Sequence, residues 1–434
     1  MSTLIAVGGA LVFFVGILVS IALHELGHMV PAKLFGIKVT QYFVGFGRTL
    51  WSRRRGETEY GLKLIPAGGF VRIVGMLPPT ADGRQRRWST GAFQSLIDDA
   101  RSASAEEIGE ADQHRAFYRQ AWWKKVIVMA AGPSVNLVLA VLLISISMMG
   151  IGVYRSTTTL ARVYDCVLPA TSPATTCPDG APQSPARAAG LEAGDRIVSI
   201  DGAPISSWRE AQDQIRVAAG RTVSLVVERD GAQLDKQISV VPNQSPDLND
   251  PSKTVTAGFI GVSPGSIRSA AGVGETAGYL KDMVGATLNA MWHLPQRMVN
   301  VVKAVGGEPR SQDSPVSVVG ASRVAGEIAT GDIGLGTRLI VSDRVALMLS
   351  ALGGLNLFVG LFNLLPLLPL DGGHIFGALW EAVKRGIARL RHKPDPGHVD
   401  VAKALPLVYA IASVLVVMGG LLLVADIINP VRLG

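Results

Sequence analysis

The feature that most constrains this chain is a run of residues, 4–23, that contains no charged side chain. A helix needs about 20 mostly apolar residues to cross the hydrocarbon core of a bilayer, so this run is long enough to span a membrane. Three further apolar runs lie at about 126–153, 345–370 and 405–428. The sequence therefore predicts a multi-pass α-helical membrane protein with about four transmembrane helices.

The first run lacks the features of a cleaved signal peptide. No basic residue precedes it, and no small-residue cleavage site lies before His24. We therefore expect residues 1–30 to form a retained transmembrane helix. Two weaker apolar stretches, in 277–305 and 315–340, carry Lys, Arg and Asp residues. Because charges are expensive inside a membrane, these stretches predict amphipathic helices within the segment 244–344.

The basic residues are concentrated in two connecting segments, 31–125 and 381–404. The positive-inside rule places such segments in the cytoplasm. Four spans then put both termini, and the long segment between the second and third spans, outside the cytoplasm. The formal net charge of +7 could also indicate nucleic-acid binding, but no recognition motif accompanies it. Membrane topology explains the basic excess, and we expect no nucleic-acid partner.

The cytoplasmic segment 31–125 has two parts. Short apolar runs separated by Gly and Pro predict a membrane-associated β-hairpin at about 45–76, with a turn at Arg54-Arg55-Gly56 and a break at residues 66–69. Residues 79–120 are rich in Arg, Ser and acidic side chains, which indicates a mobile connection with one helix near 104–119.

The extracytoplasmic segment contains a small β-rich domain at 161–243. Strand-like runs precede the Asp-Gly pairs at 201–202 and 230–231, and residues 207–218 have helical spacing. The stretch from Ser184 to Ile197 resembles the signature of PDZ domains in bacterial membrane proteases. That resemblance implies peptide binding by strand addition, although a structural spacer would share the pattern.

The chain has two cysteines, Cys166 and Cys177, and both fall in this extracytoplasmic segment. Disulfides persist in oxidising compartments. We therefore expect these two residues to form a disulfide that closes a short loop.

The first span ends in the sequence His24-Glu25-Leu26-Gly27-His28. Residues four apart share one face of a helix, so both imidazoles can bind one ion. In the HExxH arrangement of zinc peptidases the two histidines bind zinc and the glutamate acts as general base. Because the motif adjoins a charge-free span, where unpaired ionisable groups are costly, a chance match explains it poorly.

A catalytic zinc site needs a third protein ligand and one position for water. Asp371 follows the apolar run of residues 363–370 and is the candidate. His374 is an alternative ligand or a hydrogen-bond partner of one. Asp371 could also cap a helix at 374–384, which would not prevent it from binding the metal. Asn363 could bind the substrate carbonyl or pack between helices. HELGH and the sequence that contains Asp371 both lie near the inner ends of spans that run from outside to inside. We therefore expect the two motifs at similar depth in the membrane.

The chain resembles the site-2 protease family, and especially its actinobacterial members with one PDZ domain that cut anti-sigma factors. Besides HELGH and the sequence NLLPLLPLDGG at 363–373, the resemblance rests on residues 46–47, 65–70 and 131–136. It implies zinc bound by His24, His28 and Asp371, with Glu25 as base and Asn363 as a substrate contact. It also implies that residues 61–74, including Gly68, Gly69 and Phe70, pair with an unwound substrate strand.

The resemblance implies an intramembrane zinc metalloprotease of the bacterial cell membrane, with its active site toward the cytoplasm. Its partners would be the lipid bilayer and membrane proteins that carry a transmembrane helix, such as anti-sigma factors or remnant signal peptides. A non-catalytic adaptor would not need Glu25. A metal transporter would also use intramembrane His and Asp but would keep its function without the glutamate.

Overall fold

A computed structural model describes most of the chain: residues 2–76, 110–168, 177–246, 254–310, 314–331, 339–399 and 404–431. The predicted mobile connection at 79–120 falls largely outside the described residues. The chain divides into two compact units. The first comprises Met1–Ile151 and Gly272–Gly434, and the second comprises Gly152–Ala271.

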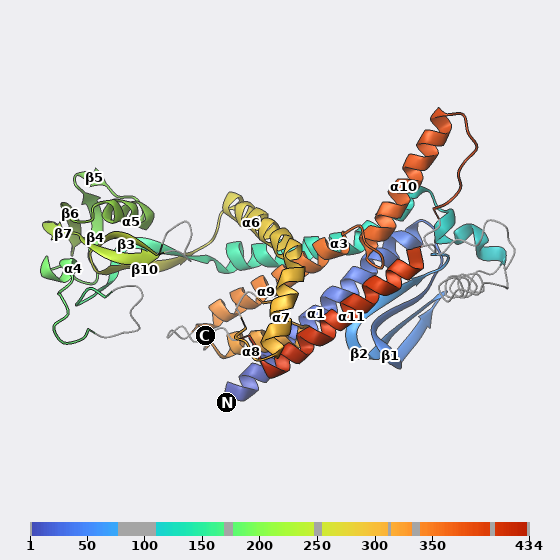
Figure 1. Cartoon of the computed structure of the whole chain (residues 1–434), viewed down its shortest axis with the longest axis horizontal. Coiled ribbons are helices and arrows are strands. Elements are labelled where there is room, and N and C mark those ends of the chain that lie inside the picture. The colour runs from blue at the N-terminus through green and yellow to red at the C-terminus, as the bar shows by residue number, and fades with distance from the viewer. Residues whose placement is uncertain are drawn as a thin grey trace. The chain divides into compact units, whose positions relative to one another are not determined.

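The four apolar runs form four helices of the first unit that are long and apolar enough to cross a membrane, among the described residues. They are α1 (Ser2–Leu34), α3 (Trp122–Ser145), α9 (Val341–Asn363) and α11 (Leu405–Ile428). A π-helical turn, η3 (Ile146–Ile151), extends α3. These helices, with the β regions below, give the architecture of an integral membrane protein (Figure 1).

The relative directions of three spans follow from their close contacts. Residues in order along α1 meet residues in the same order along α9: a Cβ on Gly16 would lie 2.9 Å from Leu352, and Ser20 accepts a hydrogen bond from Asn356. The order is reversed between α3 and α9, where Gly353 approaches Ile144 and Gly360 approaches Leu137. Helix α9 therefore runs parallel to α1 and antiparallel to α3.

The chain around the third apolar run, at 345–370, forms two helices. Helix α9 ends at Asn363, and α10 begins at Asp371 and continues to Leu390, into the predicted loop 381–404. Pro366 and Pro369 lie between the helices and have no N–H to continue a helical ladder. The connection folds tightly back, because a Cβ on Gly372 would lie 2.1 Å from the Leu365 carbonyl oxygen.

The hairpin is longer than the sequence predicted. Strand β1 (Val39–Arg55) and strand β2 (Thr58–Ile73) are joined at residues 56–57, and β2 continues through the predicted break at 66–69. Both strands bend, so that residues 41–44 pair with 59–62 and also with 69–72. Two strands therefore form a sheet that is four segments wide, and the segment 69–72 lies at one edge. The hairpin contacts α1.

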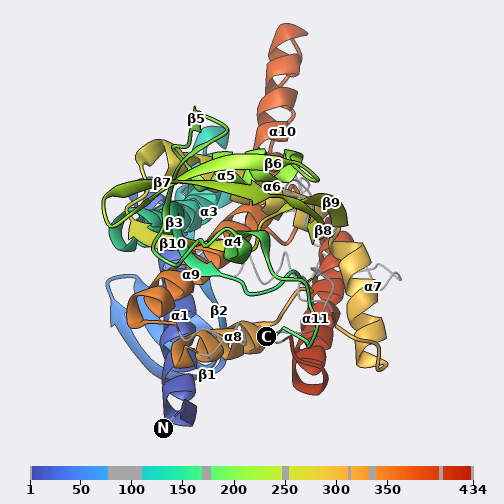
Figure 2. The same cartoon turned by 90° about the vertical axis from the view of Figure 1, so that its left-hand side faces the viewer.

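The remaining helices of the first unit are α6 (Val273–Trp292), α7 (Leu294–Val305) and α8 (Val318–Thr330). Helix α11 packs against α7 and α8, with Val301, Leu422 and Ala425 buried between α7 and α11 (Figure 2). Two short 3₁₀ helices, η1 (Glu110–Arg115) and η2 (Phe117–Arg119), precede α3. A second apolar cluster joins α1, the hairpin, η2 and α3, and it includes Met29, Phe117 and Val128.

The second unit is a β-sheet domain that exceeds the predicted 161–243 at both ends. Its main sheet has the strand order β10-β3-β4-β6-β7, with β5 paired to β4, and β8 pairs with β9. The strands are β3 (Val153–Val163), β4 (Arg196–Ile200), β5 (Ala203–Pro204), β6 (Thr222–Arg229), β7 (Ala232–Ser239), β8 (Val241–Pro246), β9 (Thr254–Phe259) and β10 (Val262–Ser269).

Local sequence signals explain much of this unit. Asp230 and Gly231 both have positive φ in the turn between β6 and β7, as two-residue hairpins require. Helix α5 (Trp208–Val217) starts at Ser207, which forms a capping box with Glu210. A second helix, α4 (Pro185–Ala188), is a single turn. The expected disulfide between Cys166 and Cys177 is confirmed.

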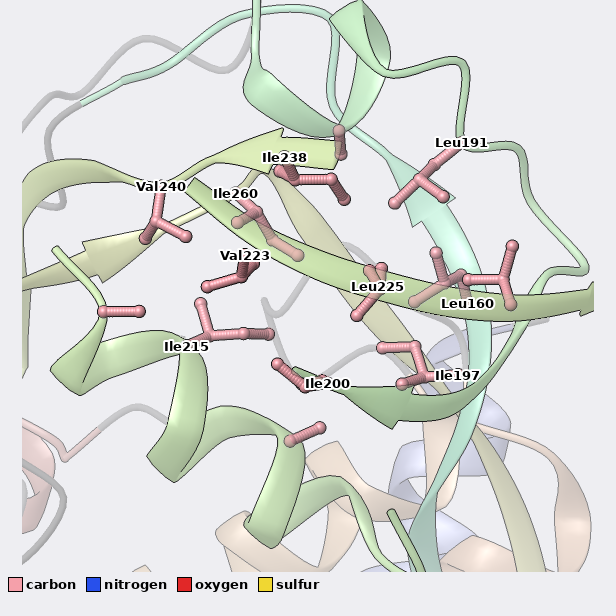
Figure 3. Close-up of a cluster of buried hydrophobic side chains, with 14 residues drawn as sticks. Leu160, Leu191, Ile197, Ile200, Ile215, Val223, Leu225, Ile238, Val240 and Ile260 are labelled. Atoms are coloured by element: carbon pink, nitrogen blue, oxygen red, sulfur yellow. The ribbon is translucent and has the colours of Figure 1, made fainter. Parts of the chain in front are cut away.

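Aliphatic side chains from the sheet and α5 form the core of the second unit (Figure 3). Ile197, Leu225 and Val227 have no exposed surface. Burying each such side chain stabilises a fold by about 1.5–3 kcal/mol.

Candidate metal centre

Two histidine side chains meet on one face of α1. His24 and His28 are one turn apart, and their Nε2 atoms are separated by 3.2 Å. Both residues are buried, with 9% and 6% of their surface exposed. The spacing of the HELGH sequence therefore brings both imidazoles to one point within an apolar helix.

Asp371 reaches the same point from a distant part of the chain. Its Oδ2 atom lies 3.4 Å from His24 Nε2 and 3.3 Å from His28 Nε2. Around a tetrahedral zinc ion with bonds of about 2.0–2.1 Å, ligand atoms lie about 3.3–3.4 Å apart. Both the spacing of the three atoms and their types, two imidazole nitrogens and one carboxylate oxygen, fit zinc.

His374 is not part of this cluster. Among the described residues, the donor atoms that lie within 4.8 Å of one another belong to His24, His28 and Asp371. The alternative in which Asp371 caps a helix at 374–384 is wrong, because α10 begins at Asp371 with Leu370 as its N-cap. A carboxylate in the first turn of a helix also interacts favourably with the helix dipole.

The second ring nitrogen of His28 fixes which nitrogen can bind a metal. Nδ1 lies 2.8 Å from the Val128 carbonyl oxygen of α3. A carbonyl can only accept a hydrogen bond, so Nδ1 carries the proton and donates it. Nε2 is then left with a lone pair toward the cluster. Backbone carbonyls commonly orient metal-binding histidines in this way.

Two glycines let α1 and α3 approach closely enough for this contact. A Cβ on Gly27 would lie 2.8 Å from the Ala131 carbonyl oxygen, and a Cβ on Gly132 would lie 2.2 Å from His28 Nε2. His28 therefore occupies the space that a side chain at position 132 would fill. Gly132 belongs to the family motif at residues 131–136, and its role depends on the contact with His28, which the sequence alone did not predict.

Glu25 lies beside the cluster and against the hairpin. A Cβ on Gly69 would lie 2.9 Å from Glu25 Cγ, so the absence of a side chain there admits the glutamate. His24 and Glu25 both line a cavity of about 230 Å³ between α1, α3, α9 and β2. The cluster is therefore reachable from a space larger than a water molecule needs.

Three of the predicted substrate contacts line this cavity, namely Asn363, Gly68 and Gly69. Phe70 is not among its lining residues; its ring stacks on Phe43 and Phe46 at centroid distances of 5.6 and 6.3 Å. The cavity also brings in Ser20, Asn136 and Asn356, which sequence analysis did not single out as site residues. In the sequence these three residues stand out as polar residues within apolar runs.

A buried ion pair joins α3, whose carbonyl orients His28, to α10, which carries Asp371. Lys125 Nζ of α3 lies 2.8 Å from Glu381 Oε2 of α10, and 7% and 2% of the two side chains are exposed. Helix α3 carries the Val128 carbonyl and α10 carries Asp371. Lys125 was assigned to a basic loop from the sequence; it is instead a buried residue of α3 because Glu381 neutralises it.

A second set of charges holds the far end of the hairpin. Arg115 of η1 donates to both carboxylate oxygens of Glu57, at 2.8 and 2.7 Å, in the turn between β1 and β2. These hydrogen bonds lower the pKa of the Glu57 carboxyl. The hairpin is thus tied to the chain that leads into α3.

Known proteins resemble this chain over most of its length. The model of the family described as peptidase family M50 matches residues 12–394. Zinc metalloprotease Rip1 of Mycobacterium tuberculosis strain H37Rv is 35% identical over 442 residues, which cover 98% of this chain and 99% of the relative. Zinc metalloprotease Rip1 of Mycolicibacterium smegmatis is 34% identical and covers 98% of each chain.

A more distant relative gives the same result. Metalloprotease MmpA of Caulobacter vibrioides is 26% identical over 383 residues, which cover 87% of this chain and 86% of the relative. The chain therefore belongs to peptidase family M50, the site-2 protease family, and is a zinc metalloprotease with the helices of an integral membrane protein.

Proposed function

We propose that this enzyme hydrolyses peptide bonds within the transmembrane segments of membrane proteins, with zinc held by His24, His28 and Asp371 and with Glu25 as general base. One observation carries the proposal. Three donor atoms lie 3.2–3.4 Å from one another, and both histidines belong to a helix that is apolar enough to cross a bilayer. A site on a helix that can cross the bilayer suits a substrate that is itself in the membrane.

The residues around the cluster divide the chemistry between them. Zinc held by these residues would supply a Lewis acid and a water whose pKa falls toward about 7. Glu25 would be the general base that accepts a proton and returns it to the leaving amine. The Asn363 side-chain amide, which lines the same cavity, donates to the carbonyl oxygen of the scissile bond as negative charge develops there.

The edge of the hairpin sheet offers a place for the substrate backbone. Residues 69–72 pair with 41–44 on one side, and within the described residues no strand pairs with their other side. A peptide bond inside a helix must be exposed before it can be cut, and in a bilayer the freed N–H and C=O groups need partners. Strand addition at this edge would supply those partners, next to Glu25.

The membrane orientation follows from the basic segments and the helix directions. Parallel α1 and α9 with antiparallel α3 support an alternation of spans. The positive-inside rule then puts the metal centre toward the cytoplasm, and both termini and the second unit outside. In this arrangement the second unit acts as a PDZ-like domain that excludes substrates whose outer domain has not been removed.

The substrate class follows from the same arrangement. The substrates are single helices left in the bacterial cell membrane after an outer domain is lost, and anti-sigma factors and remnant signal peptides have this form. Recognition then rests on the exposed helix rather than on a folded partner.

The test uses purified enzyme in proteoliposomes with a reporter that contains one transmembrane helix. Glu25→Ala is expected to keep its zinc and lose about 10²- to 10⁴-fold in cleavage rate, whereas His24→Ala and Asp371→Ala are expected to lose zinc as well. A chelator control excludes other proteases. Cleavage by Glu25→Ala at the wild-type rate would refute the assignment of the base and favour a non-catalytic role for the motif.

A further inference from the structure

The cavity beside Glu25 extends well past the metal centre. Its lining on α1 runs from Glu25 and His24 back to Ile17, a distance of about 10 Å along the helix axis. An extended chain covers that length with about three residues. The volume, about 230 Å³, exceeds the roughly 150 Å³ of an engineered cavity that holds benzene.

The walls of this extension are mostly aliphatic. They include Ile17 and Ile21 of α1 and Leu355 and Val359 of α9. Such walls suit the apolar side chains of a transmembrane segment. Among them lie polar side chains that a purely apolar pocket would not need, because polar groups in a membrane are costly without partners.

Asn356 is the most informative of these. Its Nδ2 donates both hydrogens, to the Leu352 carbonyl at 2.8 Å and to Ser20 Oγ at 3.0 Å. Ser20 in turn donates to the Gly16 carbonyl. Because a backbone carbonyl can only accept, the atom that faces Leu352 must be the amide nitrogen. The side chain therefore has one orientation.

That orientation leaves the Asn356 Oδ1 atom buried without a donor. Asn136 of α3, which is 2% exposed and lines the same cavity, also has a buried Oδ1 atom without a donor. Buried polar groups in folded proteins are almost always paired. Two residues that line one cavity thus each carry an acceptor without a donor, and a ligand that brings hydrogen-bond donors would satisfy them.

We propose that Asn356 and Asn136 bind the unwound substrate segment next to the scissile bond by accepting hydrogen bonds from its freed backbone N–H groups. An opened transmembrane helix has the required chemistry: apolar side chains for the aliphatic walls and N–H groups that have lost their helical partners. This inference rests on the proposed function and specifies how the substrate is held. This binding subsite lies on α3 and α9 and is separate from the hairpin edge.

The experiment combines enzyme variants with synthetic transmembrane peptides in which single peptide bonds are replaced by esters. An ester removes one N–H donor and leaves the side chains unchanged. The enzymes are wild type, Asn356→Leu, Asn136→Leu and the matched control Ser350→Ala. Ser350 also makes a polar contact of α9, with Ser147 at 2.9 Å, but it does not line the cavity.

With the unmodified peptide, each Asn→Leu variant is expected to lower kcat/KM by about tenfold, while Ser350→Ala stays near wild type. Zinc content is expected to be unchanged in all four enzymes. With wild type, an ester at one position on one side of the scissile bond is expected to lower kcat/KM by a similar factor. The same ester is expected to have almost no further effect in the Asn variant whose hydrogen bond it removes.

Three results would overturn the inference. The first is wild-type kcat/KM for both Asn variants. The second is an ester effect of equal size in wild type and variants at every position. The third is dependence on Ser, Thr or Asn side chains of the peptide without any ester effect, which would assign the donors to side chains instead. Loss of cleavage in Glu25→Ala alongside any of these results would leave the proposed function intact.

Discussion

The two units of this protein place the same types of aliphatic residue in opposite environments. In the second unit, Ile197 and Leu225 are completely buried in a sheet domain. In the first unit, Leu4, Val12 and Val15 of α1 are 78%, 67% and 54% exposed, while glycine, histidine and asparagine occupy the contacts between helices. The second unit is organised by removing apolar surface from water, whereas the first presents that surface to lipid.

The difference explains where the chemistry lies. Lipid tails are as apolar as leucine, so helices in a membrane associate through close packing of small residues and through polar contacts. Gly27 and Gly132 provide the close approach, and His28 with Val128 provides a polar contact. The interior of the first unit thus holds ionisable groups between its helices, whereas the aliphatic cluster of the second unit contains none. The buried carboxylate of the second unit, Asp195, is neutralised by Arg229.

The largest effect is expected from filling the space beside His28. Gly132→Ala would put a methyl group 2.2 Å from the present position of His28 Nε2, so the imidazole must leave the cluster. Loss of bound zinc and a fall in activity of more than about 100-fold are expected. Gly150→Ala is the matched control in the same span, because its nearest neighbour is 3.9 Å away. Full zinc in Gly132→Ala would show that His28 is not a ligand.

A smaller effect is expected at the buried ion pair. Glu381→Leu leaves Lys125 charged and buried, which should lower the free energy of unfolding by about 3–5 kcal/mol. The double variant Lys125→Met/Glu381→Leu should recover only part of that loss, because it removes the unpaired Lys125 charge but leaves Arg385, which lies 3.1 Å from Glu381, without this partner. Unfolding in mixed micelles measures both. An equal loss of unfolding free energy in the single and double variants would mean that the unpaired charge of Lys125 does not cause the loss.

The contrast between the units can be tested with matched truncations. Leu225→Ala should destabilise the second unit by about 3 kcal/mol through loss of packing. Val15→Ala, at a position of α1 that is mostly exposed, should change stability by less than about 0.5 kcal/mol. Hydrogen exchange of the full chain in micelles resolves the two units. A large effect at Val15 would reveal a packing partner on that face of α1.

The smallest effect concerns pH. Burial by itself would raise the pKa of the Asp195 carboxyl, but hydrogen bonds from Arg229, at 2.7 and 2.8 Å, and from the Glu192 N–H lower it overall. The unfolded state, with a pKa of about 3.9, therefore takes up a proton first as the pH falls. The second unit should lose stability as the pH falls below about 4.

Replacing this carboxyl should remove that dependence. Asp195→Asn is expected to lower stability at pH 7 by about 2 kcal/mol and to flatten the acid limb of the stability curve. Hydrogen exchange in the second unit between pH 3 and 7, corrected for intrinsic exchange rates, provides the measurement. An unchanged acid limb in the variant would assign the acid sensitivity to another group.

The sequence predicted the parts of this molecule that depend on local signals. The four apolar runs, the helix at 207–218 and the turn at Asp230-Gly231 all follow from short patterns. The convergence of Asp371 with the two histidines was predicted because the topology gave both motifs the same depth.

Contacts between distant residues were beyond such patterns. His28 and Val128 are 100 positions apart, Lys125 and Glu381 are 256 apart, and Ser20 and Asn356 are 336 apart. The bend that makes the hairpin four segments wide arises from pairing of β1 with two parts of β2. In each case the role of a residue depends on its contact with a residue far away in the sequence. The periodicity of its own segment does not indicate that contact.

The central claim is that His24, His28 and Asp371 hold one zinc ion within reach of Glu25. Anomalous diffraction at the zinc absorption edge, on crystals of the enzyme in a lipid phase, tests it directly. One strong peak is expected about 2.0–2.2 Å from His24 Nε2, His28 Nε2 and an Asp371 carboxylate oxygen, and it should vanish in Asp371→Ala. A zinc peak coordinated by other residues, with Asp371 free of metal, would contradict the account.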